Sequence, residues 1–186
     1  MYECGDLKKG LKIVIDGDPY IVTQFDFVKP GKGQALYKCR LKNMMTGSQF
    51  DRTYRSGEKF QQADLEEVQM EYLYFDGENY HFMNNSDYSQ EAISAAQIGD
   101  SKYFLKDNTV CNVLLYDRKP IEVTLPNFVE LKIIKADPWV KGDTASGDSK
   151  PATLETGYLV QVPPFVEEGE QIKIDTRTGQ YVERVK

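Results

Sequence analysis

Residues 20 to 41 read YIVTQFDFVKPGKGQALYKCRL, and this stretch decides the class of fold. Two runs rich in β-branched and aromatic residues flank a turn that contains Pro30, Gly31 and Gly33. Proline fixes φ and glycine permits left-handed backbone values, so the chain can reverse here at low strain. The stretch therefore predicts two strands joined by a β-hairpin, with Lys32 between two glycines at its tip.

Short β-type runs of the same kind recur along the whole chain. Turn signals such as Asp16-Gly17, Asp76-Gly77 and Thr178-Gly179 separate pairs of them. The predicted strands are residues 11–15, 20–25, 35–41, 72–75, 80–83, 110–116, 121–124, 129–135, 158–162, 171–175 and 180–184. Helical periodicity is scarce, and only residues 89–98 are predicted to form one or two helical turns. We expect an all-β protein of small barrels, because barrel closure removes the exposed edges of short strands.

Two breaks divide the chain into three segments, residues 1–63, 64–126 and 127–186. The first break lies near the polar run QQAD and the second at Leu125-Pro126-Asn127. Each segment is close to the lower size limit for independent folding. The Gly-, Ser- and Asp-rich stretch 140–156 is predicted to be a long loop, a type of segment that frequently binds partners.

The net charge of −6 is distributed unevenly, with +4 in the first segment, −8 in the second and −2 in the third. A basic footprint is typical of nucleic-acid binding, so the average charge argues against an RNA partner while the first segment favours one. Attraction to RNA at one end with repulsion along the middle is one interpretation of this polarity. The other is the uneven charge that is common in proteins without such a partner.

Cysteine and histidine are too few for most catalytic or metal sites. Cys4, Cys39 and Cys111 are far apart and form no CxxC pair, which fits neither a disulfide framework nor a thiolate metal site. His81 is the single histidine, and its strand-like setting YHFMNN indicates a structural role. We expect no metal and no cofactor. Without a long apolar stretch or a leader-like start, we expect a cytoplasmic protein with no membrane contact.

The neighbours of Lys32 limit the chemistry it can perform. A phosphate-binding loop needs Ser or Thr and a helix after its lysine, whereas Gly33, Gln34 and a strand follow Lys32. A catalytic lysine needs burial to lower its pKa, which flanking glycines oppose. Lys32 is therefore either a solvated turn lysine or a contact residue that projects into whatever the protein docks against.

Two separate parts of the sequence resemble the bacterial elongation factor P family. The turn FVKPGKGQA, residues 27–35, is similar to the family's modification loop, with Lys32 at the modified lysine. The signature of the family's last domain is matched by Lys150-Pro151-Ala152, Gly157, Val160, Val162-Pro163, Val166 and Gly169. The stretches LYFDGENYHFMNN, PNFVELKI and DTRTGQYVERVK extend the resemblance over essentially the whole chain. The family is related to the hypusine-containing factor of archaea and eukaryotes.

This resemblance implies a fold and a function. The fold is an SH3-like, KOW-type barrel over residues 1–63, followed by OB-fold barrels over 64–126 and 127–186, in a tRNA-like overall shape. The function is that of a non-enzymatic translation factor that binds both ribosomal subunits between the P and E sites and relieves stalling at consecutive prolines. Its loop lysine reaches toward the CCA end of peptidyl-tRNA and positions it for the ribosome's own catalytic centre. We expect a monomer.

The resemblance also assigns further site residues. Lys29, Pro30, Gly31, Gly33 and Gln34 accompany Lys32 in the modification loop. Lys29, Lys38, Arg40 and Lys42 are candidate phosphate contacts, with ordinary solvated charge as the alternative. Gly142-Asp143-Thr144 match the motif that approaches the E-site codon of mRNA, and Tyr181 and Arg184 match positions implicated in tRNA contact. A turn and an exposed strand end would explain these last residues equally well.

A lysine-modifying enzyme is a further implied partner. Such an enzyme would act on Lys32 by β-lysylation, through a relative of lysyl-tRNA synthetase, by hydroxylation or by another extension. A lysine at this position excludes the branch in which an arginine is rhamnosylated. The sequence leaves the choice among the lysine modifications open.

Two other readings of the sequence remain. One is a paralogue of the family, or a generic OB-fold RNA-binding protein, that works without modification. The other is a carboxylate-dependent hydrolase that uses acidic pairs of the middle segment, such as Glu66 with Glu67. Adjacent residues of a strand point to opposite faces, and the segment has no cluster of His or Cys, which disfavours the hydrolase.

Overall fold

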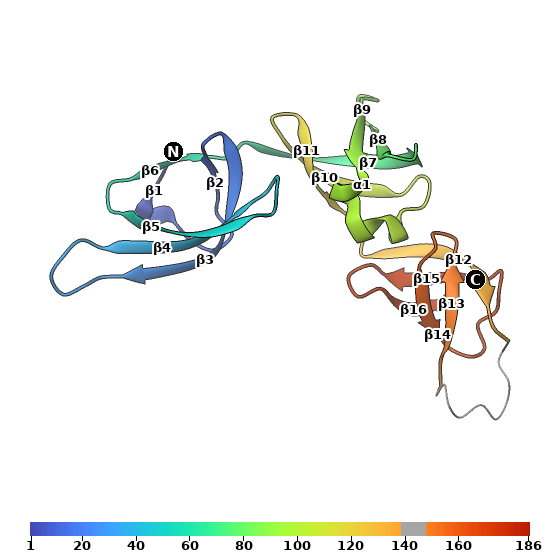
Figure 1. Cartoon of the computed structure of the whole chain (residues 1–186). Coiled ribbons are helices and arrows are strands. Elements are labelled where there is room, and N and C mark those ends of the chain that lie inside the picture. The colour runs from blue at the N-terminus through green and yellow to red at the C-terminus, as the bar shows by residue number, and fades with distance from the viewer. Residues whose placement is uncertain (139–147) are drawn as a thin grey trace. The chain divides into compact units, whose positions relative to one another are not determined.

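Figure 1 shows the computed structural model of the chain, which describes residues 1–138 and 148–186. The strands are β1 (Tyr2–Glu3), β2 (Lys12–Ile15), β3 (Asp18–Val28), β4 (Leu36–Asn43), β5 (Gln49–Arg55), β6 (Lys59–Gln62), β7 (Leu65–Phe75), β8 (Asn79–Asn84), β9 (Gln90–Ser94), β10 (Val110–Tyr116), β11 (Lys119–Thr124), β12 (Phe128–Ala136), β13 (Lys150–Leu154), β14 (Leu159–Val162), β15 (Gln171–Asp175) and β16 (Gln180–Arg184). The helical elements are η1 (Cys4–Asp6), α1 (Ala95–Ile98) and η2 (Gly99–Phe104). Among the described residues, no helix is long and apolar enough to cross a membrane.

The described strands form three sheets. A six-stranded sheet has the order β1-β6-β2-β3-β4-β5, and two five-stranded sheets have the orders β11-β10-β7-β8-β9 and β14-β13-β12-β15-β16. The pairs that bound the first sheet's hairpins are antiparallel, as short connections require. The prediction of an all-β protein built from small curled sheets is confirmed.

Turn chemistry explains the hairpins at residue level. Asp16 and Gly17 have φ values of 51° and 88°, and Ile15 pairs with Asp18 across them. Two left-handed residues between paired strands are the turn whose twist matches a β-hairpin. Asp117 and Arg118 make the corresponding turn between β10 and β11 without glycine, at φ values of 49° and 62°.

The contacts divide the chain into two compact units. The first unit combines Met1–Glu67 with Leu114–Glu122. Alternating residues of its strands point inward, so Ile13, Val22 and Leu41 are fully buried in one apolar core. The Tyr116 hydroxyl belongs to this unit and donates a hydrogen bond to the Gly17 carbonyl oxygen at 2.9 Å.

The second unit combines Val68–Val113 with Val123–Lys186. An apolar core of this unit lies in the β12–β16 sheet, where the inward residues of β12 include Leu131 and Ile133. Phe104 at the end of η2 is buried in the same core and packs edge-on against Tyr158 at 5.1 Å. Residues on either side of the predicted break at 126 therefore share one core.

The predicted strands all coincide with observed ones, and 110–116, 171–175 and 180–184 have the observed bounds. The prediction for residues 89–98 is wrong in its first half, because Gln90–Ser94 is the edge strand β9 and pairs with β8. The helix is limited to Ala95–Ile98, where the Ser94 hydroxyl accepts a hydrogen bond from the Gln97 backbone amide. Tertiary pairing has overridden local helix propensity here.

Candidate nucleic-acid interface

Lys32 lies at the tip of the β3–β4 hairpin, which extends beyond the rest of its sheet (Figure 1). The last paired residues of the hairpin are Val28 and Leu36, and residues 29–34 of the connecting loop are exposed. Lys32 makes no hydrogen bond or ion pair with any described residue, so its ammonium group is available to a partner.

Of the two glycines beside Lys32, only Gly33 has a left-handed backbone, with a φ of 140°. A Cβ atom at Gly33 would lie 3.6 Å from the ring of Pro30, whereas one at Gly31 would meet nothing within 4 Å. Gly33 is therefore required by the turn itself, while Gly31 leaves open space on the other side of the lysine.

An aromatic column stiffens the stem of the hairpin. The rings of Phe25 and Tyr37 lie 6.4 Å apart, and those of Tyr37 and Phe27 lie 5.1 Å apart. Phe25 and Tyr37 pack against the core of the first unit, whereas Phe27 is 48% exposed. The column connects the rigid barrel with the loop that carries Lys32.

The candidate phosphate contacts of β4 differ in their availability. Lys38, Arg40 and Lys42 alternate along the strand with buried residues and are exposed. The Arg40 guanidinium donates two hydrogen bonds to Asp51, at 2.7 and 3.1 Å. This pairing lowers the pKa of Asp51 and raises that of Arg40. Lys38 and Lys42 have no such partner among the described residues and are free to meet phosphate.

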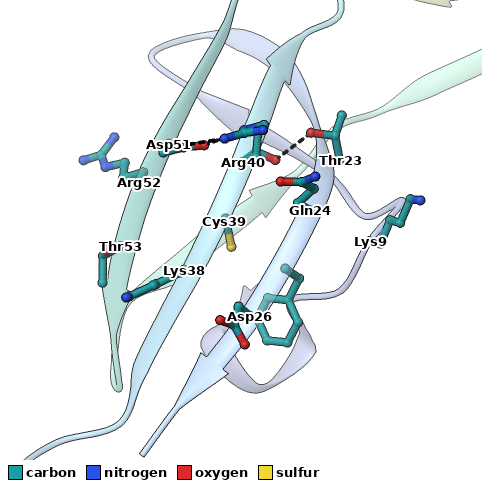
Figure 2. A pocket seen from close by; sticks show the side chains of 11 residues that line it. Lys9, Thr23, Gln24, Asp26, Lys38, Cys39, Arg40, Asp51, Arg52 and Thr53 are labelled. Atoms are coloured by element: carbon teal, nitrogen blue, oxygen red, sulfur yellow. Dashed lines mark hydrogen bonds and ion pairs between the residues drawn. The ribbon is translucent and has the colours of Figure 1, made fainter.

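A pocket of about 570 Å³ lies beside these cations on the same sheet (Figure 2). Its lining residues are Lys9, Thr23, Gln24, Phe25, Asp26, Lys38, Cys39, Arg40, Asp51, Arg52 and Thr53. Figure 2 shows Lys9 and Arg52 on opposite sides of it, with the Arg40–Asp51 pair between. Burial raises the pKa of the Cys39 thiol to about 11, so this sulfur is not a nucleophile at neutral pH. The pocket carries more cations than carboxylates and suits an anion.

The sequence did not identify several of these residues. Asp51, Arg52 and Thr53 lie on β5, a strand that was not predicted. The available signal was weak, because Phe50 and Tyr54 are the two aromatic residues of QFDRTYR and polar residues fill the positions between them. The partner of Arg40 follows from register alone, because Arg40 stands opposite Asp51 in the β4–β5 pair. Lys9 reaches the pocket from a loop, and no local signal marks it.

The other predicted site residues lie elsewhere. Gly142, Asp143 and Thr144 are outside the described residues. Tyr181 and Arg184 are on β16, in the second unit. Arg184 donates a hydrogen bond to Glu170 at 3.2 Å and lies 4.8 Å above the ring of Phe165, while Tyr181 packs against the apolar core. Both residues therefore have structural partners in this state.

His81 and the acidic pair also have structural positions. His81 stacks on Tyr74, with ring centroids 4.5 Å apart, and its Nε2 atom lies 2.7 Å from Asp76. Glu66 and Glu67 are consecutive residues of β7 and point to opposite faces, so they cannot act as a pair. Nothing in these positions supports the hydrolase reading.

The fold and the hairpin define a class of protein that is built from small β-barrels and presents a lysine on a basic loop. Three family models match successive parts of the chain: the elongation factor P KOW-like domain over residues 3–60, the OB domain over 65–123 and the C-terminal domain over 129–184. The chain belongs to the elongation factor P family, and its role is that of a translation elongation factor.

Full-length relatives agree with these matches. The chain is 66% identical to elongation factor P of Desulfosudis oleivorans, with 100% of both chains covered. It is 62% identical to elongation factor P of Desulforapulum autotrophicum, over 100% of this chain and 99% of the relative. Among solved structures, translation initiation factor 5A from Methanococcus jannaschii is similar in fold, with a TM-score of 0.56 and 18% identity, over 66% of this chain and 94% of that one.

Proposed function

We propose that this chain binds the ribosome between the P and E sites and stimulates peptide-bond formation at consecutive prolines. In this proposal Lys32 positions the CCA end of peptidyl-tRNA, and the ribosome makes the bond. The observation that carries the proposal is the exposed, unpartnered Lys32 at the tip of a stiffened hairpin. Family membership supplies the translation context.

The chemistry of proline explains why positioning helps. Proline has a restricted φ, so a polyproline donor and acceptor adopt unproductive geometries. Holding reactants in a near-attack arrangement recovers a large entropic part of a reaction barrier. A long flexible cation is suited to phosphate and hydroxyl contacts in a narrow RNA cavity, and small neighbours allow the backbone to enter it.

The finer assignments belong to the same proposal. Residues 1–63 would form the domain that faces the tRNA acceptor end, with 64–126 and 127–186 as the two following domains. Lys29, Lys38 and Lys42 would contact phosphate, Tyr181 and Arg184 would contact tRNA, and residues 142–144 would approach the E-site codon. The protein would act as a cytoplasmic monomer after an enzyme has extended Lys32.

A reconstituted translation assay with a Pro-Pro-Pro reporter tests the proposal. Lys32→Ala should lose most of the rescue activity, whereas Lys8→Ala, an exposed lysine of the same unit, should retain it. Rescue by Lys32→Ala at the wild-type level would instead favour an unmodified paralogue or a generic RNA-binding protein. The intact mass of protein from its native host, with peptide mapping around Lys32, identifies the modification. A mass equal to that of the plain chain would contradict the hypothesis that Lys32 is modified.

A further inference from the structure

The stem of the hairpin carries an exposed ring that core packing does not explain. Phe27 is 48% exposed, although its neighbours in the aromatic column, Phe25 and Tyr37, pack against the core. Phe27 pairs with Tyr37 in the β3–β4 register, one position before the last pair of the hairpin. The ring therefore sits beside the modification loop, held from one side by Tyr37 and open on the other.

The chain that follows this ring is basic, whereas the residue before it, Asp26, is acidic and stands opposite Lys38 in the β3–β4 pair. From residue 27 to residue 50 the sequence contains no Asp or Glu and five basic residues, Lys29, Lys32, Lys38, Arg40 and Lys42. Arg40 forms an ion pair with Asp51, whereas the four lysines form no ion pair with the described residues. A polyanion is the partner that this charge complements.

An exposed aromatic ring followed by the unpaired lysines of a loop, here Lys29 and Lys32, is an arrangement suited to single-stranded nucleic acid. Cations follow the phosphate backbone, while the ring stacks on a base, and stacking tolerates any base because each has a π-face. A duplex would hide its bases from such a ring. The chemistry therefore selects an unpaired nucleotide over a helix.

We propose that Phe27 stacks on an unpaired base of the tRNA 3′ end, while Lys29, two residues further along the chain, contacts a flanking phosphate. This inference rests on the proposed function and adds a second contact to that of Lys32. Lys32 reaches the end of the strand, and Phe27 holds a nucleotide before it. Two contacts fix the direction of a flexible strand, which one flexible lysine does not do.

Binding of short RNA by the full chain tests the stacking contact. The probes are an unstructured CA-repeat RNA that ends in CCA and a matched RNA of the same length without bases. Phe27→Leu should weaken binding of the first probe by about fivefold to 150-fold, the range for losing one stacked base, and leave the second unchanged. Phe27→Trp should retain or strengthen binding of the first probe. Amide shifts of Gly31 and Gly33 in NMR spectra localise the binding to the hairpin.

Phe50→Leu is the matched control. Phe50 is 38% exposed and packs edge-on against Tyr20 at 5.5 Å, in the same sheet but opposite Leu41 of β4. Its substitution should leave the affinity for both probes unchanged. Equal losses for both probes in Phe27→Leu, or no loss for either, would overturn the stacking contact.

The Pro-Pro-Pro reporter separates this inference from the function beneath it. Loss of rescue in both Lys32→Ala and Phe27→Leu, with the mass of Lys32 unchanged in the latter, is the expected result. Loss in Lys32→Ala alone would overturn the stacking contact and leave the proposed function intact. Wild-type rescue by Lys32→Ala would contradict the proposed function itself. A missing extension on Lys32 in Phe27→Leu would show that Phe27 serves the modifying enzyme instead, which also overturns the proposal.

Discussion

The β3–β4 hairpin and the β7–β9 part of the second sheet each expose an aromatic ring, but the local charge is positive in the hairpin and negative in β7–β9. Phe27 is 48% exposed on the hairpin, and Tyr74 is 51% exposed on β7. Residues 27–50 contain five Lys and Arg and no acid, whereas residues 65–94 contain seven Asp and Glu and no Lys or Arg. The local charge separates two surfaces that hydrophobicity alone would class together.

The two rings also differ in what supports them. Tyr74 stacks on His81, and His81 in turn contacts the Asp76 carboxylate. The support of this ring therefore includes an acidic side chain. Phe27 packs at a tilt against Tyr37, and Tyr37 in turn packs against the apolar core. The proposed RNA contact is therefore limited to the ring that is followed by unpaired lysines, and phosphate would be repelled from the β7–β9 surface.

Charge reversal on the hairpin should have the largest effect on ribosome binding. Lys29→Glu, Lys38→Glu and Lys42→Glu together should lower affinity for ribosomes by about two to three orders of magnitude, because three phosphate contacts become repulsive. The slope of log affinity against log salt should fall by about 2 to 3. Equilibrium binding across a salt series measures both. Glu66→Gln, Glu67→Gln and Glu71→Gln should change little, and an equal effect there would remove the distinction between the surfaces.

The two glycines beside Lys32 should differ in their effect on stability. Gly33→Ala should lower the free energy of unfolding by about 1 kcal/mol, because alanine is strained at its left-handed φ of 140°. Gly31→Ala should cost almost nothing, because its backbone is not left-handed and its Cβ would enter open space. Urea unfolding measures the difference. Equal costs would mean that the turn does not have the described geometry.

Asp51 should control how much Arg40 contributes to RNA binding. Asp51→Asn removes the partner of Arg40 and should steepen the salt dependence of ribosome binding by just under one unit, as one more phosphate contact becomes available. Lys38→Gln should reduce the slope by a similar amount, whereas Arg40→Gln should reduce it less. An Arg40→Gln effect as large as that of Lys38→Gln would show that the ion pair opens on binding.

The smallest expected effect is on the thermal stability that Asp76 contributes in the turn between β7 and β8. Hydrogen bonds from the Asn79 backbone amide, His81 and the Glu78 backbone amide lower the pKa of Asp76 to about 2. A depressed carboxyl pKa stabilises the fold above the ordinary value of about 4, and the stabilisation is lost as pH falls toward 2. The thermal midpoint of Asp76→Asn should therefore lie below that of wild type at pH 7, and the two should converge between pH 4 and 2. A difference independent of pH would exclude this carboxylate as its source.

The sequence predicted the fold class and the hairpin because both depend on local signals. Alternation and a glycine-containing turn identified β3 and β4, and the family resemblance drew attention to Lys32. The partnership of Arg40 with Asp51 depends on the register between the neighbouring strands β4 and β5, and β5 was missed. The helix predicted at 89–98 forms only over Ala95–Ile98, since pairing with β8 made Gln90–Ser94 a strand. Pairing between strands, rather than the pattern within one strand, determined what was missed.

In the proposed function, Lys32 positions the tRNA end and does not merely attract RNA. Single-turnover formation of a Pro-Pro bond, measured against factor concentration, distinguishes these two roles. We expect Lys32→Ala to lower the maximal rate by about tenfold to a hundredfold, while the concentration for half-maximal effect changes little and Lys8→Ala matches wild type. A wild-type maximal rate reached at higher concentration would rule out positioning, because Lys32 would then contribute only affinity.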